Sequence, residues 1–309
     1  MRKEAKIYIA GHGGMVGSAL TRRLLADGYS NIVRRTHSEL DLTRQADVEA
    51  FFAGEKPEYV FLAAAKAGGV HANSTYPADF IFENLAIELN VISAAAKSGV
   101  KKLLFIGSTS VYPKNAPQPI SEASLLTGEL EPSNAAYGLA KIVGLKLCEY
   151  CNRQYGTEFI SVMPTNLYGY GDKYDLQNAH VLPALIRKFS EAVDGGADKV
   201  EIWGSGAARR EFLHADDLAD ACLFLMERYN EAQPVNVGAG TDLTIRELAE
   251  LLKSVSGFTG ELFFDKSKPE GIMRRLTDCS KLFSMGWKPK INFEKGVTMV
   301  YNDYRTEQN

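Results

Sequence analysis

Short apolar runs alternate with longer amphipathic segments through the first half of the chain. The runs fall at residues 7–10, 32–35, 59–64, 103–107 and 159–163, and the segments with helical periodicity at 19–26, 46–52, 79–98 and 136–154. This alternation predicts an α/β fold, namely a Rossmann-like doubly wound parallel sheet with helices on both faces. Ligands of such sheets bind beyond the carboxyl ends of the strands.

The second half of the chain is less regular. After Gly169 we expect a polar loop, a helix, a strand, a second helix and a strand that rejoins the sheet edge, at residues 172–178, 180–193, 200–203, 217–228 and 234–237. From Thr244 onward the pattern predicts a helix, a strand at 261–264, a loop at 265–275 and a terminal helix. We therefore expect a larger domain over 1–170, to which 211–238 returns, and a smaller α/β lobe formed by 171–210 and 239–309.

A glycine-spaced turn, residues 11–17, follows the first apolar run and precedes a helical segment. Strand, glycines and helix in this order direct backbone N–H groups and the helix dipole at a pyrophosphate. The Gly-x2-Gly-x2-Gly spacing resembles the extended branch of the short-chain dehydrogenase/reductase superfamily. The expected dinucleotide-binding residues in this turn are Gly11, Gly14, Met15, Val16 and Gly17.

Tyr137 and Lys141 lie four residues apart in a helical segment, and Ser108 follows the fourth apolar run. At this separation the two side chains leave the same face of a helix, so an ammonium can lie beneath a phenol and favour its ionised form. Such a phenol can protonate the oxygen of a ketone as it accepts a hydride. A tyrosine and a lysine at this spacing are common by chance, but together with the glycine turn they indicate a coenzyme-dependent enzyme.

The residues after the second strand bear on the choice of coenzyme. An NAD site places an acid about 20 residues beyond the glycines, whereas an arginine there accommodates the phosphate of NADP. Here Arg34 and Arg35 occur without an acid before Glu39, which favours NADP(H); the alternative is a solvated surface pair. Asp41 and Leu42 are expected at the adenine. Residues 63–66, including Ala64 and Ala65, are expected to line the dinucleotide.

Composition narrows the function classes further. The chain has 309 residues, 45% of them hydrophobic and 24% charged, and a formal net charge of -3. This balance is typical of a globular protein and gives no electrostatic footprint for nucleic acid or for an acidic membrane surface. The apolar runs are too short for a signal peptide or a membrane helix, so we expect a cytoplasmic protein. Cys148 and Cys151 form a single Cys-x2-Cys inside a helical segment, and we expect buried thiols and no metal site.

Several longer strings make a closer resemblance, to the GDP-L-fucose synthase family, nearly from end to end. They lie at residues 68–73, 76–80, 118–120, 130–134, 163–169 and 210–214. The resemblance implies a C3 and C5 epimerisation of GDP-4-keto-6-deoxy-mannose followed by C4 reduction with NADPH. It also implies that the larger domain binds NADP and that the smaller lobe binds the GDP-sugar.

Site residues are carried over from the family by position. The resemblance makes Ser108, Tyr137 and Lys141 the ketoreductase triad and His180 the epimerisation acid, although a histidine opening a helix can also be a cap or a surface residue. Lys141, Pro164, Asn166 and Leu167 join the coenzyme site. The implied GDP-sugar residues are Asn166, Val181, Lys188, Trp203, Arg210 and Arg275. Core packing is the alternative for Trp203, and an ion pair with Glu211 or Asp216 for Arg210.

Three positions depart from the family pattern. Ser110 replaces the cysteine that acts as the epimerisation base, and a serine hydroxyl needs a strong neighbouring base before it can accept a proton. Gly13 replaces an arginine near the NADP phosphate. Arg209 replaces an apolar residue beside the expected substrate channel, which is compatible with a modified sugar.

We therefore predict a C4 reductase of a GDP-4-keto-6-deoxy sugar in which epimerase activity is weakened or lost. A complete GDP-L-fucose synthase remains the alternative. Two rivals come from other classes: a non-catalytic NADP-binding regulator, and a 4-epimerase or dehydratase of the extended branch. The long helices near 80–98 and 136–154 are apolar around much of their circumference, so we expect a homodimer through them; the alternative is two helices buried within one subunit.

Overall fold

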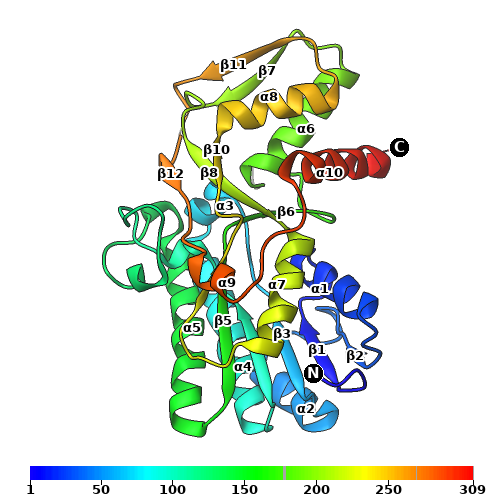
Figure 1. Cartoon of the computed structure of the whole chain (residues 1–309), viewed down its shortest axis with the longest axis vertical. Coiled ribbons are helices and arrows are strands. Elements are labelled where there is room, and N and C mark those ends of the chain that lie inside the picture. Colours follow the sequence, from blue (N-terminus) through cyan, green and yellow to red (C-terminus); the bar gives the residue numbers. More distant parts are fainter. Residues whose placement is uncertain (177–178, 269, 309) are drawn as a thin grey trace.

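The computed structural model describes residues 1–176, 179–268 and 270–308, and its larger part is built on a six-stranded sheet (Figure 1). The strand order is β2-β1-β3-β4-β5-β9, with every neighbouring pair parallel. The predicted α/β class is confirmed, and the expected strand near 234–237 does rejoin the sheet edge as β9. The strands are β1 (Ile7–Ala10), β2 (Ile32–Val33), β3 (Tyr59–Leu62), β4 (Lys102–Ile106), β5 (Glu158–Pro164) and β9 (Val235–Val237).

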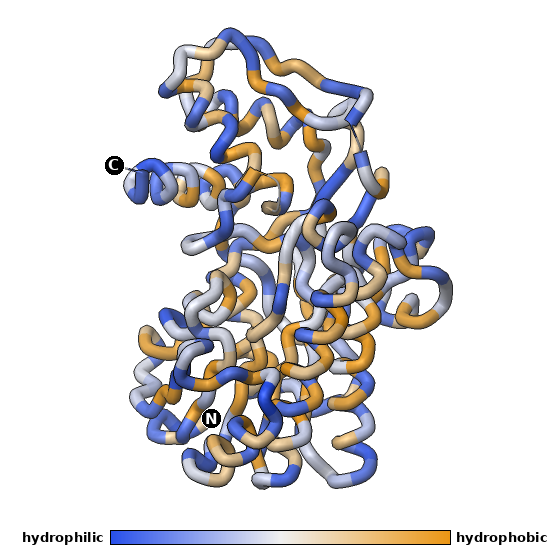
Figure 2. The backbone as a smooth tube through the Cα atoms, turned by 180° about the vertical axis from the view of Figure 1, so that it is seen from behind, coloured by the Kyte–Doolittle hydropathy of each residue, from blue (hydrophilic) through white to orange (hydrophobic). Residues whose placement is uncertain are grey.

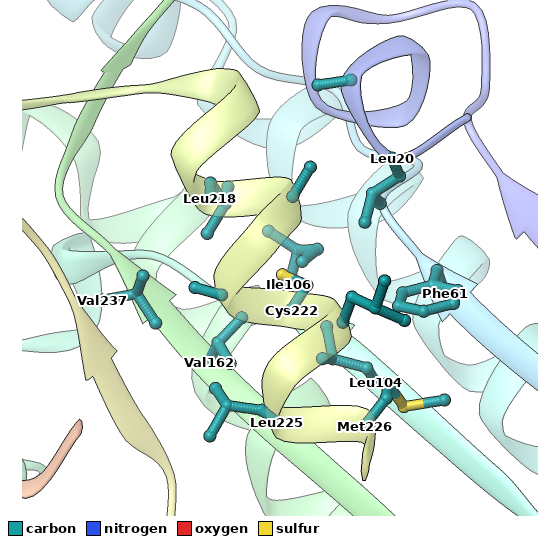
Figure 3. Packing of buried hydrophobic residues seen from close by; sticks show 14 of the residues in the cluster. Leu20, Phe61, Leu104, Ile106, Val162, Leu218, Cys222, Leu225, Met226 and Val237 are labelled. Carbon is teal, nitrogen blue, oxygen red and sulfur yellow. The ribbon is translucent and has the colours of Figure 1, made fainter. Parts of the chain in front are cut away.

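Helices cover both faces of this sheet. One face carries α1 (Met15–Ala26) and α7 (Ala215–Arg228), and the other carries α2 (Gln45–Glu55), α4 (Pro77–Lys97) and α5 (Ala135–Tyr155). Figure 3 shows Leu218, Cys222 and Leu225 of α7 lying over side chains of β4 and β5. Burying a side chain of this size contributes roughly 1.5–3 kcal/mol, so these two layers hold the sheet rigid beneath the site.

The second lobe contains two small sheets and three long helices, arranged as in Figure 1. One sheet has the order β10-β8-β12, with β6 also paired to β8, and the other pairs β11 with β7. Because β8 belongs to this lobe, the chain returns to the large sheet with α7 at Ala215, later than the expected residue 211. The elements are β6 (Asn166–Tyr168), α6 (Val181–Asp194), β7 (Lys199–Trp203), β8 (Arg209–His214), β10 (Asp242–Thr244), α8 (Ile245–Ser256), β11 (Glu261–Asp265), β12 (Arg274–Arg275) and α10 (Phe293–Gln308).

Helix α8 illustrates how local sequence sets these boundaries. The Thr244 hydroxyl accepts a hydrogen bond from the Glu247 N–H at 3.0 Å, and the Glu247 carboxylate accepts one from the Thr244 N–H at 2.6 Å. This capping box fixes the first turn, and Gly257 in the left-handed region ends the helix. Figure 2 shows hydrophobic stretches concentrated along the large sheet and its helices, with a more mixed pattern in the second lobe.

Some expectations need correction. The strand expected at 32–35 ends at Val33, so Arg34 and Arg35 lie in the loop beyond it, and the first helix begins at Met15 because it starts within the glycine turn. Shorter elements were not expected: α3 (Val70–Thr75), α9 (Ser280–Ser284) and three 3₁₀ helices, η1 (Thr109–Val111), η2 (Glu122–Ser124) and η3 (Pro132–Asn134). Parts of the expected loops 172–178 and 265–275, namely 177–178 and 269, lie outside the described residues, as does residue 309.

The thiols behave as expected, since Cys148 and Cys151 are both buried and unpaired. Within the described ranges, no helix combines the length and the apolar character needed to cross a membrane. The same ranges contain no cluster of three or more histidine, cysteine or acidic side chains suited to a metal ion.

Candidate active site

The glycine turn forms a tight cradle at the carboxyl end of β1. Gly11 has φ +83°, and a Cβ there would lie 2.6 Å from the Ala64 backbone nitrogen. A Cβ on Gly17 would lie 2.1 Å from the Gly11 carbonyl oxygen. Only glycine fits either position. No side chain caps the start of α1 at Gly14, so the first-turn N–H groups of Met15 and Val16 are suited to bind a phosphate.

The two arginines after β2 differ in their surroundings. Arg35 donates to the Glu55 carboxylate at 2.5 Å and lies 5.7 Å from the centre of the Phe51 ring. Arg34 is exposed, and the described residues offer its guanidinium no ion-pair partner. Arg34 is therefore the arginine available for a ribose phosphate. A Cβ on Gly13 would meet nothing within 4 Å, so the turn has room for a side chain there.

The expected adenine end also has a defined local structure. The Asp41 carboxylate accepts hydrogen bonds from the backbone N–H and the hydroxyl of Thr43, at 2.9 and 2.7 Å, and these hold the pKa of Asp41 below its usual value. Leu42 is buried beside it. These hydrogen bonds fix the local conformation of the turn.

The loop after β3, which contains Ala64 and Ala65, is fixed by a residue that sequence patterns did not single out. Asn84 of α4 is fully buried, accepts from the Lys66 N–H at 3.1 Å and donates to the Lys66 carbonyl at 3.0 Å. A polar residue on the buried face of an otherwise apolar helix is the sign that could have indicated it. On the other side of the cradle, Pro164, Asn166 and Leu167 lie at the end of β5 and in β6.

Tyr137 and Lys141 share a face of α5, as their spacing predicts. The Lys141 Nζ lies 5.8 Å from the centre of the Tyr137 ring and donates to the Ile106 carbonyl at 3.1 Å. Ser108 lies just beyond the end of β4 at the sheet edge, and its Oγ accepts from the Ser110 N–H at 3.1 Å. The 3₁₀ helix η1 packs closely on the first turn of α5. A Cβ on Gly138 would lie only 2.6 Å from the Ser110 carbonyl oxygen, so glycine permits this approach. The structure therefore brings the three predicted residues to one edge of the sheet.

Ser110 has a different environment. Its Oγ accepts a hydrogen bond from the Asn134 side-chain amide at 3.2 Å, and no basic side chain among the described residues forms a hydrogen bond with it. Asn134, which sequence patterns did not single out, directly precedes α5. An amide N–H cannot take up a proton from the serine, so this contact gives the hydroxyl no basicity.

His180 is the N-cap residue of α6, but its side chain forms no cap hydrogen bond. The imidazole is solvent-exposed, yet protein surrounds it closely enough that desolvation lowers the pKa of His180. Val181 follows as the first residue of α6.

A buried and a half-buried arginine lie side by side where β8 and β12 pair. Arg210 and Arg275 are register partners in this parallel pair, and Arg275 donates to the Thr109 carbonyl at 2.9 Å. Burial and the neighbouring Arg210 lower the pKa of Arg275 to about 10. Neither arginine forms an ion pair within the described part of the chain. The alternative pairing of Arg210 is wrong, because Glu211 accepts from Thr277 and Gly240 and Asp216 pairs with Arg22.

Two adjacent guanidinium groups without an ion-pair partner among the described residues favour a bound anion, so this pair is suited to a diphosphate. Arg209 leaves the opposite face of β8 and donates to the Asp242 carboxylate at 2.8 Å. The expectation that Arg209 lies beside the substrate channel is therefore not supported by its position.

Trp203 at the end of β7 is 50% exposed, which overturns the core-packing alternative. Its indole N–H donates to the Glu201 carboxylate at 3.0 Å, and the Lys188 Nζ lies 5.6 Å from the ring centre. Lys188 itself donates to the Glu201 carbonyl at 2.9 Å. An accessible aromatic face beside a lysine is suited to stacking on a base or ribose.

Comparisons with known proteins place this arrangement among nucleotide-sugar enzymes. Residues 7–238 match the NAD dependent epimerase/dehydratase family. The GDP-L-fucose synthase 1 of Arabidopsis thaliana is similar to this chain, with 58% identity over 302 residues that cover 98% of this chain and 94% of that protein.

Two solved structures are also similar over nearly the whole chain. A GDP-6-OMe-4-keto-L-xylo-heptose reductase from C. jejuni has 42% identity and a TM-score of 0.93, covering 100% of this chain and 99% of that one. A GDP-mannoheptose C4 reductase from Campylobacter jejuni with NADP bound has 44% identity and a TM-score of 0.91, covering 99% of each chain.

Proposed function

Since the chain belongs to the GDP-L-fucose synthase family, within the NAD-dependent epimerases and dehydratases, we propose that it is an NADPH-dependent C4 reductase of a GDP-4-keto-6-deoxy sugar. The observation that carries the restriction to reduction is the environment of Ser110, whose hydroxyl contacts an amide and no base among the described residues. The names of the two similar Campylobacter structures, both reductases of GDP-linked sugars, support the same restriction.

The residues present fit NADP(H). The cradle of Gly11 and Gly17 admits a pyrophosphate where any Cβ would collide, and exposed Arg34 supplies a cation for the additional phosphate. The coenzyme, when bound, supplies a hydride. Ala64, Ala65, Pro164 and Leu167 would line its site.

The remaining steps belong to side chains of this chain. Tyr137 donates a proton to the C4 oxygen as the ketone becomes an alcohol, and Ser108 hydrogen-bonds that oxygen. Lys141 places a cation within 5.8 Å of the Tyr137 ring centre, which favours release of the phenolic proton. The fixed geometry of these groups, all on rigid elements, orients the ketone before reaction.

The GDP moiety would bind across the second lobe. Arg210 and Arg275 would neutralise the diphosphate, and Trp203 with Lys188 would contact the base or ribose. Asn166 and Val181 lie between these groups and the triad in chain order, at the start of β6 and of α6. His180, which directly precedes Val181, would then face the sugar.

A complete GDP-L-fucose synthase is the second candidate, favoured by the 58% identity to the Arabidopsis enzyme. Incubation with GDP-4-keto-6-deoxy-mannose and NADPH separates the two, with and without a purified 3,5-epimerase. We expect rapid NADPH oxidation and GDP-L-fucose only when the epimerase is added. Formation of GDP-L-fucose by this protein alone would contradict the proposal, and no oxidation of NADPH in either case would refute reductase activity.

We also infer a homodimer through the outer faces of α4 and α5, testable by sedimentation equilibrium. Phe82 is 71% exposed, and Leu89, Leu139 and Val143 are also exposed on these two packed helices. Such a large apolar area on adjacent helices typically marks an interface. The four buried free thiols are in keeping with a reducing, cytoplasmic location.

A further inference from the structure

A carboxylate is buried beside the lysine of the triad. Glu88 of α4 is fully buried, and its Oε1 lies 3.1 Å from the Nζ of Lys141, which is itself 2% exposed. Charged side chains are almost never buried this deeply unless they are paired. Nothing in the sequence pattern distinguished Glu88 from the surface acids of the same helix.

The protein makes space for this carboxylate inside α5. Gly144 lies in the middle of that helix, one turn beyond Lys141, where glycine is unfavourable. A Cβ at this position would lie 2.8 Å from the Glu88 Oε2 and 2.5 Å from the edge of the Phe105 ring. A glycine that weakens the helix therefore occupies a position where a larger side chain would collide with Glu88.

The Lys141 ammonium is held from three sides. Besides Glu88, it contacts the Ile106 carbonyl at 3.1 Å and lies 4.7 Å from the centre of the Phe105 ring. Ile106 and Phe105 belong to β4 at the floor of the site. Neither can neutralise a charge, so Glu88 is the counter-ion, and its loss would leave a buried cation uncompensated.

We propose that Glu88 is a positioning residue that keeps Lys141 charged and in place beneath Tyr137. This inference rests on the role proposed above for Tyr137, and it concerns how that role is supported. A neutral residue at position 88 favours loss of the lysine proton, and a neutral lysine no longer favours ionisation of the Tyr137 phenol. Without Glu88, the Tyr137 pKa therefore rises.

Few other titratable groups face this pair. Burial raises the pKa of Glu88, and the Lys141 ammonium opposes that shift. Cys148 of α5 is buried nearby, and burial raises its pKa far above its usual range. Strands β4 and β5 contribute Phe105, the Ile106 carbonyl and Ser161, which do not titrate. Beyond the Phe80 ring, which lies 6.4 Å from the ring of Tyr137, is an exposed cluster of Lys66, Asp79 and Glu83.

The test follows Tyr137 directly in the coenzyme-free protein, by NMR titration of ¹³Cζ-labelled tyrosine with Tyr137→Phe to assign the signal. For Glu88→Gln we expect the Tyr137 titration to move up by about one pH unit or more. The alkaline limb of ketone reduction should move in the same direction. Glu88→Asp keeps the charge and should restore both. Because the NMR arm needs no substrate, it remains informative if the proposed reductase activity fails.

Asp220→Asn is the matched control, since Asp220 is a buried carboxylate paired with Arg23 and Lys290 on the opposite face of the sheet. It should lower stability and leave Tyr137 unmoved. An unchanged or lowered Tyr137 titration in folded Glu88→Gln, or an equal upward shift in Asp220→Asn, would overturn the inference. If Glu88→Gln does not fold, Glu88→Gln/Lys141→Met is compared with Lys141→Met: equal titrations support action through the lysine, and unequal ones contradict it.

Discussion

The two sides of the candidate site differ in how firmly their side chains are held by neighbouring groups. On the triad side, Lys141 is buried against β4 and paired with Glu88, and Ser108 follows a strand of the central sheet. On the other side, the Ser110 hydroxyl has a hydrogen bond from the Asn134 amide and none from a basic side chain among the described residues, and the exposed His180 opens α6 without a side-chain cap.

This difference indicates which chemistry the chain supports. A preorganised proton donor needs its partners fixed before the substrate binds, and the triad side has them. Removing a proton next to a ketone needs a base of raised basicity, and Ser110 has no neighbour among the described residues that supplies it.

Tyr137→Phe should lower kcat for ketone reduction by about 10²- to 10⁴-fold, because it removes the proton donor. NADPH affinity, measured by fluorescence, should change little. Tyr155→Phe, which alters an exposed tyrosine at the end of the same helix, is the control and should be neutral. A fully active Tyr137→Phe enzyme would show that the triad side of the site does not supply the proton donor.

Arg275→Met should raise KM for the GDP-sugar about tenfold to a hundredfold, through loss of about 1.5–3 kcal/mol of charge-assisted binding. The same change should raise the unfolding temperature without ligand, because it removes an uncompensated buried cation. Arg274→Met is the neighbouring control: Arg274 is exposed and pairs with Asp242, so KM should stay unchanged. Equal KM values in both variants would argue against a diphosphate at this pair.

Sequence patterns predicted the site residues that depend on local structure better than those that depend on contacts between distant parts of the chain. The spacing of Tyr137 and Lys141 is a local helical property, and the glycine turn is local too, so both were predictable. The Arg210–Arg275 pair joins strands far apart in the chain and was indicated only by the family resemblance. Glu88 could not be found in this way, because its burial depends on a glycine in a different helix.

Gly13→Arg should lower KM for NADPH severalfold while leaving KM for NADH unchanged. A Cβ at this position would have no neighbouring heavy atom within 4 Å, so an arginine is accommodated and adds a cation beside Arg34. Gly13→Gln is the uncharged control. An equal improvement for both coenzymes would show that the effect is not phosphate recognition.

Asp172→Asn probes the loop that leads to His180. Burial raises the pKa of Asp172 from 3.8 to about 6, so the fold favours the protonated acid, and this stability is present below pH 3.8 and lost as the pH rises through 6. The variant should therefore match the parent at low pH and exceed it by about 3 kcal/mol well above pH 6. Urea unfolding at pH 4 and pH 8 measures the difference. A constant difference at both values would contradict titration of Asp172 as its cause.

The most direct measurement of the contrast is exchange of the sugar protons in deuterated water. The protein is incubated with GDP-4-keto-6-deoxy-mannose without NADPH, and deuterium at C3 and C5 is followed by mass spectrometry and NMR, for the parent and for Ser110→Cys. We expect no enzyme-dependent exchange in the parent and measurable exchange in Ser110→Cys. Rapid incorporation at both carbons by the parent would contradict reduction without epimerisation.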